Sequence, residues 1–249
     1  MATAKKKTIF SNQLAVCMGI SVLAALVLFL ISGSTFIQNL ELKMLDTLFW
    51  LRGPKGGAPE VLVAEVDEKM VQNLGYPVPR KYFAFLINVL QQVGHVAIGF
   101  DIFFDMPSPL FSSDSLLCQE THDGKNVRYP AMFKRKDTTN VPDADQIRVI
   151  QSLGYDIPID EAPEPFKHKE TKGSVGFPFR KLLVGLDRLC QVNLDPDSDG
   201  NNRRVPIFIP YAGKLYPNLG LQLAMDHFGI GPEALSFRKG DLVIKLTNE

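Results

Sequence analysis

Apolar and charged positions divide the chain into an N-terminal apolar segment and a long mixed region. No charged residue occurs between Lys7 and Glu41, and nearly every residue from 14 to 31 is apolar. A run of about 20 such residues matches the length of one bilayer-spanning helix. Residues 14–36 are therefore predicted to form a transmembrane helix.

Lysines at positions 5–7 orient this predicted helix. Positive residues stay on the cytoplasmic side, so residues 1–13 are expected to form a cytoplasmic tail of an inner or plasma membrane protein. The main domain is then periplasmic or extracellular. A cleaved secretory signal ending near Ser32, Gly33 and Ser34 is one alternative, and a buried core helix is another. The segment is longer than a signal h-region of about 7–15 residues, which favours a membrane anchor.

A second apolar pattern follows the first, with spacings of three and four. Its members are Ile37, Leu40, Met44, Leu48 and Leu51. This period predicts a stalk helix over residues 37–54, continuous with the spanning helix and ended by Gly53 and Pro54. The stripe either docks onto the following domain or forms the seam of a homodimer that transmits a signal, because both arrangements need the same period.

Residues 55–249 predict a single α/β domain. The runs Val61–Asp67 and Val96–Phe104 are typical of buried strands, and the helical pattern between them ends at Gly94. A strand, a helix and a strand in this order predict a βαβ core of parallel strands.

The rest of the domain is less regular. Residues 107–172 are polar and rich in proline, so they are predicted as loop apart from a short helix over 143–153. A strand is expected over 173–177, a β-hairpin from Leu189–Leu194 and Val205–Tyr211, and a helix over 219–228. A strand pair around 235–237 and 242–246 completes the domain.

Charge and cysteine content narrow the function classes. The 27 basic and 27 acidic residues cancel, so no basic surface for nucleic acid is expected. Cys17 lies in the apolar segment, whereas Cys118 and Cys190 fall in the outer domain, where oxidation is possible. Whether these two cysteines pair is left open by the sequence.

Six short motifs occur in a fixed order from Asp46 to the C-terminal region. They are Asp46-x-x-Phe49-x-x-Arg52-Gly53, Val63–Glu68, Leu74–Arg80, Gly94–Phe104, Asn193–Gly200 with Arg203 and Arg204, and Tyr216–Leu219. Together, and next to an N-terminal anchor, they resemble the type-two CHASE domain, a sensory module of cyclases and histidine kinases. A Trp-Pro-Trp-Pro-Arg run usual in that family is Tyr76-Pro77-Val78-Pro79-Arg80 here, which argues against a shared aromatic pocket.

The resemblance implies an extracytoplasmic input domain that binds an unknown ligand. In such proteins a cytoplasmic output module follows, often a class III adenylate or guanylate cyclase, a histidine or serine/threonine kinase or a diguanylate cyclase. This chain holds no such module, so it is expected to be either the input part of a receptor or a stand-alone anchored binding module.

Two acids and one arginine are the candidate ligand-binding residues. Asp67 and Asp101 end the two predicted parallel strands, and Arg80 starts the helix between them. Ligands of open parallel sheets bind beyond the carboxyl ends of the strands. The alternative is structural, with the acids capping loops and pairing with Arg80.

An acidic string is the candidate metal site. Asp195, Asp197 and Asp199 alternate before Gly200, as oxygen ligands do at the start of a calcium-binding EF-hand loop. The twelfth position, which should be a glutamate, is Pro206, so an EF-hand is excluded. A looser calcium turn remains open beside the alternative of an acidic turn paired with nearby arginines.

No catalytic set accompanies these residues. The sequence has no Gly-rich phosphate loop, no His-Glu-x-x-His motif and no nucleophile elbow. A hydrolase built on Asp67 and Asp101 lacks a nucleophile and a paired base. The chain itself is therefore expected to be a sensor and not an enzyme.

Overall fold

The computed structural model describes residues 16–27, 29, 33–94, 97–124, 126–134, 141–157, 173–238 and 241–245. The chain forms two compact units, one of residues 1–63 with 196–203 and one of residues 64–195 with 204–249. The first unit thus takes in residues 55–63 and the loop 196–203 from the predicted domain over 55–249.

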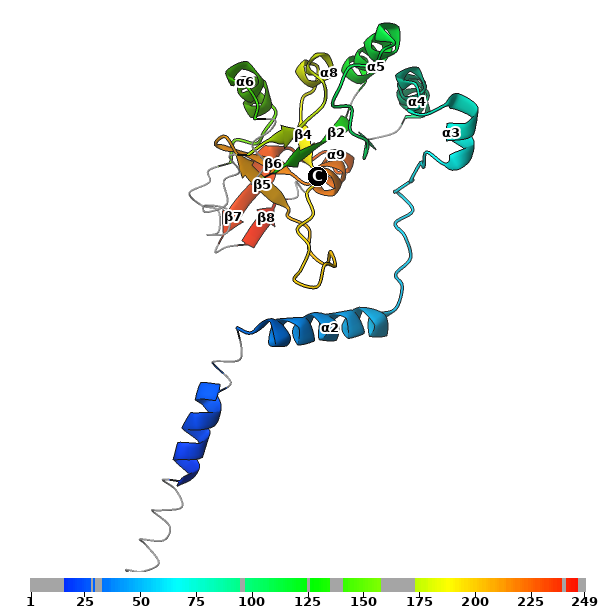
Figure 1. Ribbon diagram of the computed structural model, residues 1–249. Coiled ribbons are helices and arrows are strands. Elements are labelled where there is room, and N and C mark those ends of the chain that lie inside the picture. Colours follow the sequence, from blue (N-terminus) through cyan, green and yellow to red (C-terminus); the bar gives the residue numbers. More distant parts are fainter. Residues whose placement is uncertain are drawn as a thin grey trace, which may run out of the picture. The chain divides into compact units, whose positions relative to one another are not determined.

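The first unit contains the predicted stalk helix. Residues 16–27 are helical, and helix α2 spans Thr35–Arg52 (Figure 1). The side chain of Ser34 accepts a hydrogen bond from the backbone N–H of Ile37, and Gly53 ends the helix at a φ of 69°. Helix α2 begins at Thr35 with its own N-terminal cap, so the prediction of one helix that continues from the membrane segment into the stalk is wrong at this point. The end of α2 at Arg52 agrees with the prediction.

The predicted membrane segment is only partly covered by the structure. Positions 1–15, 28 and 30–32 lie outside the described residues, and these include the predicted cytoplasmic tail. Within the described part of the chain, no helix combines the length and the hydropathy needed to cross a bilayer. The transmembrane helix over 14–36 therefore stays a prediction.

The first predicted strand is wrong. Residues 61–66 are exposed and belong to no strand, and Asp67 caps helix α3, Glu68–Leu74. An apolar run indicates a strand only if another strand is available to pair with it. The strand beside β1 (Ile98–Gly99) is β2 (Val127–Phe133), which comes later in the chain.

Strand β2 is the centre of the main sheet. It pairs in parallel with β1 and with β4 (Leu189–Gln191), and antiparallel with β3 (Val175–Gly176). The parallel unit predicted for the core therefore exists, but it is β1, helix α5 (Phe111–Asp123) and β2. Both α5 and β2 fall in the segment predicted as loop. The sequence did not predict β2 as a strand because it contains Pro130, and proline is rare in central strands.

Helices cover this sheet. Helix α4 (Arg80–Val93) forms as predicted and ends at Gly94 in the left-handed conformation, with a φ of 79°. The short helix predicted over 143–153 is α6, Ala144–Ser152, which Asp143 and Gln146 begin as a capping box. With α8, Arg180–Val184, these helices and α5 form a row in Figure 1, and neighbours along the row contact one another.

Helix α9, Leu219–His227, packs against β1, β2 and β4, as the contacts between these elements show. Gly99 in β1 lets the side chain of Leu223 lie close to the sheet, because a Cβ atom at position 99 would lie 2.6 Å from Cδ1 of Leu223 and this side chain would have to move. The predicted helix over 219–228 is confirmed by α9, and Asn218 caps it.

The predicted hairpin between Leu189–Leu194 and Val205–Tyr211 is wrong. Strand β5, Phe208–Tyr211, pairs with β6, Lys214–Pro217, and Ala212 and Gly213 between them have positive φ angles of 49° and 77°. Such a two-residue turn matches the twist of a hairpin. The last strand pair forms as expected from β7, Leu235–Arg238, and β8, Asp241–Ile244, after a short 3₁₀ helix, η2, Pro232–Ala234.

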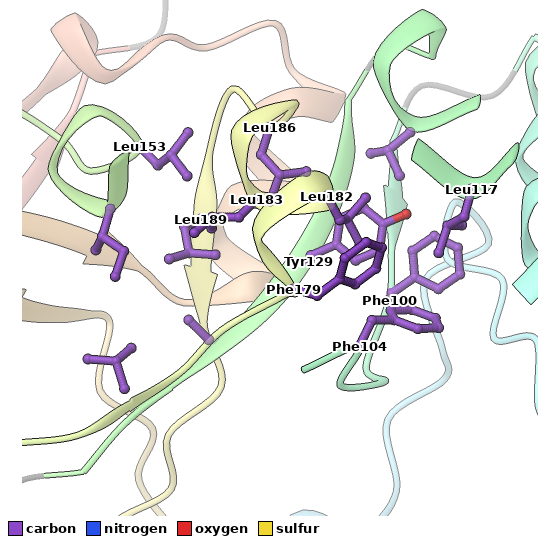
Figure 2. Close-up of a cluster of buried hydrophobic side chains, with 14 of the residues drawn as sticks. Phe100, Phe104, Leu117, Tyr129, Leu153, Phe179, Leu182, Leu183, Leu186 and Leu189 are labelled. Atoms are coloured by element: carbon purple, nitrogen blue, oxygen red, sulfur yellow. The ribbon is translucent and has the colours of Figure 1, made fainter. Parts of the chain in front are cut away.

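Two apolar cores hold the second unit. In the larger core, the ring of Phe100 stacks on Tyr129 of β2 at 5.0 Å, with Phe104 edge-on to both (Figure 2). Leu182 and Leu183 of α8 are buried in the same core. The smaller core lies under the hairpins and contains Tyr155, Ile157, Phe208, Leu215, Met225, Leu235 and Phe237.

Candidate functional site

A charged cluster in the first unit joins the acidic loop to α2. Nε and Nη2 of Arg203 donate to the two carboxylate oxygens of Asp46 at 2.6 and 2.7 Å. Nη1 and Nη2 also donate to Asp199 at 2.8 Å, and Nη1 donates to Asp197 at 3.2 Å. We call Arg203 with Asp46, Asp197 and Asp199 the clasp.

Local sequence shapes the loop that carries the clasp. The N–H of Gly200 donates to the carbonyl of Asp197, and the N–H of Asp197 donates to the carbonyl of Asn201, both at 2.9 Å. Gly200 adopts a φ of 84°, which suits glycine. This tight turn brings two carboxylates to Arg203. A further hydrogen bond, from Ser198 Oγ to Asn39 Oδ1 at 3.0 Å, fixes the loop to α2.

The clasp is electrostatically asymmetric, with one guanidinium facing three carboxylates. The side chain of Arg203 is only 5% exposed. Its hydrogen bonds lower the pKa of Asp46 and of Asp199, and the carboxylates of Asp46 and Asp199 in turn raise the pKa of Arg203. The paired, planar contact with Asp46 is specific to arginine, because lysine cannot bridge both oxygens of a carboxylate in this way.

This geometry bears on the predicted calcium turn. Asp197 and Asp199 hold the guanidinium of Arg203, so the loop places an internal cation where the sequence pattern suggested a metal ion. Across the residues that the structure describes, no group of three or more histidine, cysteine, aspartate or glutamate side chains is arranged to hold a metal ion. Asp197 and Asp199 therefore match the other interpretation of the sequence, an acidic turn whose carboxylates pair with an arginine.

The predicted transmission stripe lies on the other side of α2. Leu40, Met44, Leu48 and Leu51 are each more than half exposed, and Ile37 is half-buried. In contrast, Leu42 is buried, and it lies between the two α2 residues that bind the loop, Asn39 and Asp46. At 3.6 residues per turn, the stripe and the clasp face are roughly 170° apart around the helix.

The predicted ligand-binding residues do not come together. Asp67 is exposed and accepts the N–H of Met70 at 2.8 Å, which is its role as the cap of α3. Asp101 is exposed as well. Among the described residues, no contact joins either acid to Arg80. The expected convergence fails because residues 61–66 form no strand, so the two acids do not end neighbouring strands.

Arg80 has a partner that the sequence did not reveal. Its Nη1 donates to Asp114 at 2.7 Å, and its Nη2 donates to the carbonyl of Met106. The guanidinium also lies over the rings of Phe179 and Phe104, at 4.7 and 5.4 Å from their centres. Asp114 was missed because it lies on α5, in the segment predicted as loop.

A second buried arginine was also missed. Arg128 of β2 is 3% exposed and donates to both carboxylate oxygens of Asp226 on α9, at 2.6 and 2.8 Å. It also donates to Asp187 and to Asn126. Burial by itself would lower the pKa of Arg128, but the hydrogen bonds that Arg128 donates to Asp226 and Asp187 outweigh this effect and raise that pKa. This group ties α9 to the sheet.

The open question of the cysteines is answered by their environment. Cys17, Cys118 and Cys190 are all free thiols. Cys190 is fully buried on β4, and burial raises its pKa to about 12. A thiol with such a pKa stays protonated at neutral pH and is a poor nucleophile. Because Cys118 and Cys190 are both free thiols, the disulfide that the sequence left open is not formed.

The second unit is thus a mixed α/β domain, and within the first unit an arginine-centred loop is bound to the long helix α2. Residues 21–246 match the family model of the CHASE2 domain, and the chain belongs to this family. CHASE2 domains are extracellular sensory domains of signalling proteins. Searches of curated proteins and of solved structures each gave no match.

Proposed function

We propose that the chain is the input domain of a transmembrane receptor and that α2 carries its signal. The sensory role of the family supports this proposal, as does the exposed apolar stripe on α2. In this proposal residues 14–36 cross the inner or plasma membrane once, with the N-terminus in the cytoplasm. The observation that carries it is the division of α2 into a face bound by the clasp and an apolar face opposite to it.

The clasp gives a physical route from the sensory domain to α2. Its loop is continuous in the chain with β4 and β5, so a shift of these strands would displace Arg203. Arg203 holds Asp46 through two hydrogen bonds, and it would carry that displacement to the helix. A ligand acts by favouring one of two such arrangements of the domain. It shifts the equilibrium between them only by as much as its affinities for the two arrangements differ.

The apolar stripe is proposed to be the seam of a homodimer. Apolar side chains at alternating spacings of three and four are the pattern by which two helices pack in a coiled coil. The proposed output is a class III adenylate or guanylate cyclase, with a histidine or serine/threonine kinase as the alternative. A homodimer seam would set the relative position of the two output modules that follow it, so it suits either kind.

A double substitution tests this proposal. In the full-length receptor, Met44→Glu with Leu48→Glu should abolish stimulus-dependent output and reduce dimerisation, because two acids then face their copies across the seam. Trp50→Glu is the matched control, since Trp50 is an exposed apolar residue of α2 that lies off the stripe. Far-UV circular dichroism and the melting temperature check that both variants fold.

The two possible outcomes separate the main alternatives. Output that is lost in the double variant and kept in Trp50→Glu supports transmission through the stripe. Normal output and normal dimerisation in the double variant would instead favour an anchored binding module that does not signal through α2.

A further inference from the structure

A groove in the second unit lies beside the Arg80–Asp114 pair. It has a volume of about 520 Å³ and is formed by the loop before α5, the first turn of α5 and helix α8. Its lining includes Pro107, Phe111, Asp114, Phe179, Lys181 and Val184. This volume is within the range of small-molecule sites in proteins.

The walls of the groove are apolar and open to solvent. Phe111 is 72% exposed and Val184 is 62% exposed, although both belong to helices with well-buried inner faces. Phe179 forms a buried floor, and its ring is in turn covered by the guanidinium of Arg80. Figure 2 shows Phe179 beside Leu182 at the start of α8. Exposed aromatic and aliphatic side chains around a hollow are typical of a binding site.

The charges around the groove are unequal. Asp114 is almost fully buried, and its carboxylate accepts from Arg80 and from the N–H of Ser108, at 2.7 and 2.8 Å. Its charge is thus compensated. At the mouth, Lys181 donates to Ser115 Oγ at 2.9 Å and lies 4.8 Å from the centre of the Phe111 ring. Arg180 is exposed beside it, so the mouth carries an excess of positive charge.

We infer that this groove binds a small organic anion with an apolar body, such as an arylalkyl carboxylate. The apolar body lies between Phe111 and Val184 on the floor of Phe179, and the carboxylate meets Lys181 and Arg180 at the mouth. Arg80 and Asp114 already compensate one another at the inner end, so the cations left to meet the ligand carboxylate are Lys181 and Arg180, which fixes this orientation. Only the description of the ligand as a stimulus rests on the proposed function, since binding itself needs no output module.

The test uses 4-phenylbutyrate as the probe and its neutral amide, 4-phenylbutyramide, as the matched compound. Each is titrated calorimetrically into the whole chain held in lipid nanodiscs, and empty nanodiscs give the reference for partitioning into lipid. The carboxylate should bind about tenfold more tightly than the amide, which corresponds to one charge-assisted contact.

Two substitutions separate the parts of the site. Lys181→Gln should weaken binding of the carboxylate about fivefold to tenfold and leave the amide unchanged. Phe111→Ala should weaken both compounds, and its exposed position makes folding of the variant safe to expect. Lys245→Gln removes an exposed lysine that is not part of this lining and should change the binding of neither compound.

Three results would overturn the inference: no heat from either compound, equal binding of acid and amide, or binding that is unaffected by both Lys181→Gln and Phe111→Ala. All of these are read on the chain alone. They are therefore distinct from failure of the proposed function, which is read as output of the full-length receptor.

Discussion

The buried ion pair between Arg128 and Asp226 gives the sharpest test of the packing described above. Asp226→Asn keeps the size of the side chain but removes the charge that compensates Arg128. The remaining acid, Asp187, is 69% exposed, so its contact with Arg128 is screened by solvent and contributes little. A buried charge that loses its partner costs about 3–5 kcal/mol. We expect about 3 kcal/mol, because Asn126 and Asp187 still accept two of the hydrogen bonds.

The exposed pair of Arg148 and Asp145 on α6 is the matched control. Its side chains are 77% and 64% exposed, and the two atoms that meet are 3.2 Å apart. Such surface pairs contribute about 0–1 kcal/mol, so Asp145→Asn should change the free energy of unfolding by less than 1 kcal/mol. The two substitutions have the same chemistry and differ in burial, and burial is the variable under test.

Urea-induced unfolding in one detergent, followed by far-UV circular dichroism, measures both variants. Fluorescence of Trp50, the single tryptophan of the chain, follows the first unit in parallel. The double variant Arg128→Met with Asp226→Asn should recover much of the loss, because no unpaired charge then remains buried. The stabilising role of this pair is refuted if Asp226→Asn lowers the free energy of unfolding no more than Asp145→Asn does. It is also refuted if the double variant loses as much free energy of unfolding as Arg128→Met and Asp226→Asn lose separately, added together.

Two further predictions concern the clasp, and both are read from Trp50 fluorescence, since Trp50 lies one helical turn after Asp46. Arg203→Gln should change this fluorescence by leaving three carboxylates facing one another, and millimolar calcium should restore it by taking the place of the guanidinium. Arg203→Lys should be intermediate, and a calcium-insensitive or wild-type signal in Arg203→Gln would contradict this account. Acidification should also open the clasp. Because the pKa values of Asp46 and Asp199 are lowered in the fold, the stabilisation is complete above the ordinary aspartate pKa of about 4. It is lost as the pH falls through the lowered values. Asp46→Asn should remove the Asp46 part of this transition, and an unchanged pH profile would count against it.

Elements with local signals could be predicted from the sequence. Helix α4 ends at Gly94, α6 begins at Asp143, and α9 begins at Asn218, and each signal lies within a few residues of the boundary that it sets. The end of α2 at Gly53 is of the same kind. These boundaries depend on hydrogen bonds within one turn, which short stretches of sequence specify.

Pairings between distant segments could not be predicted in this way. Strand β2 contains Pro130 and follows a polar stretch, so nothing local marks it as the centre of the sheet. The missed partner of Arg80 lies 34 residues away, on a helix with a mixed pattern. In the acidic loop the sequence identified the carboxylates and Arg203. It did not identify Asp46 as their common partner, because the contact joins positions 157 residues apart.

The clasp has a consequence for how the loop depends on its surroundings. A metal ion that joined the loop to α2 would leave when the medium was diluted or when a chelator was added. Arg203 is covalently part of the chain, so its effective concentration at Asp46 does not depend on the medium. The link between the loop and α2 should therefore resist chelators and changes in calcium level, and respond only to protons, to high salt or to movement of the strands on either side.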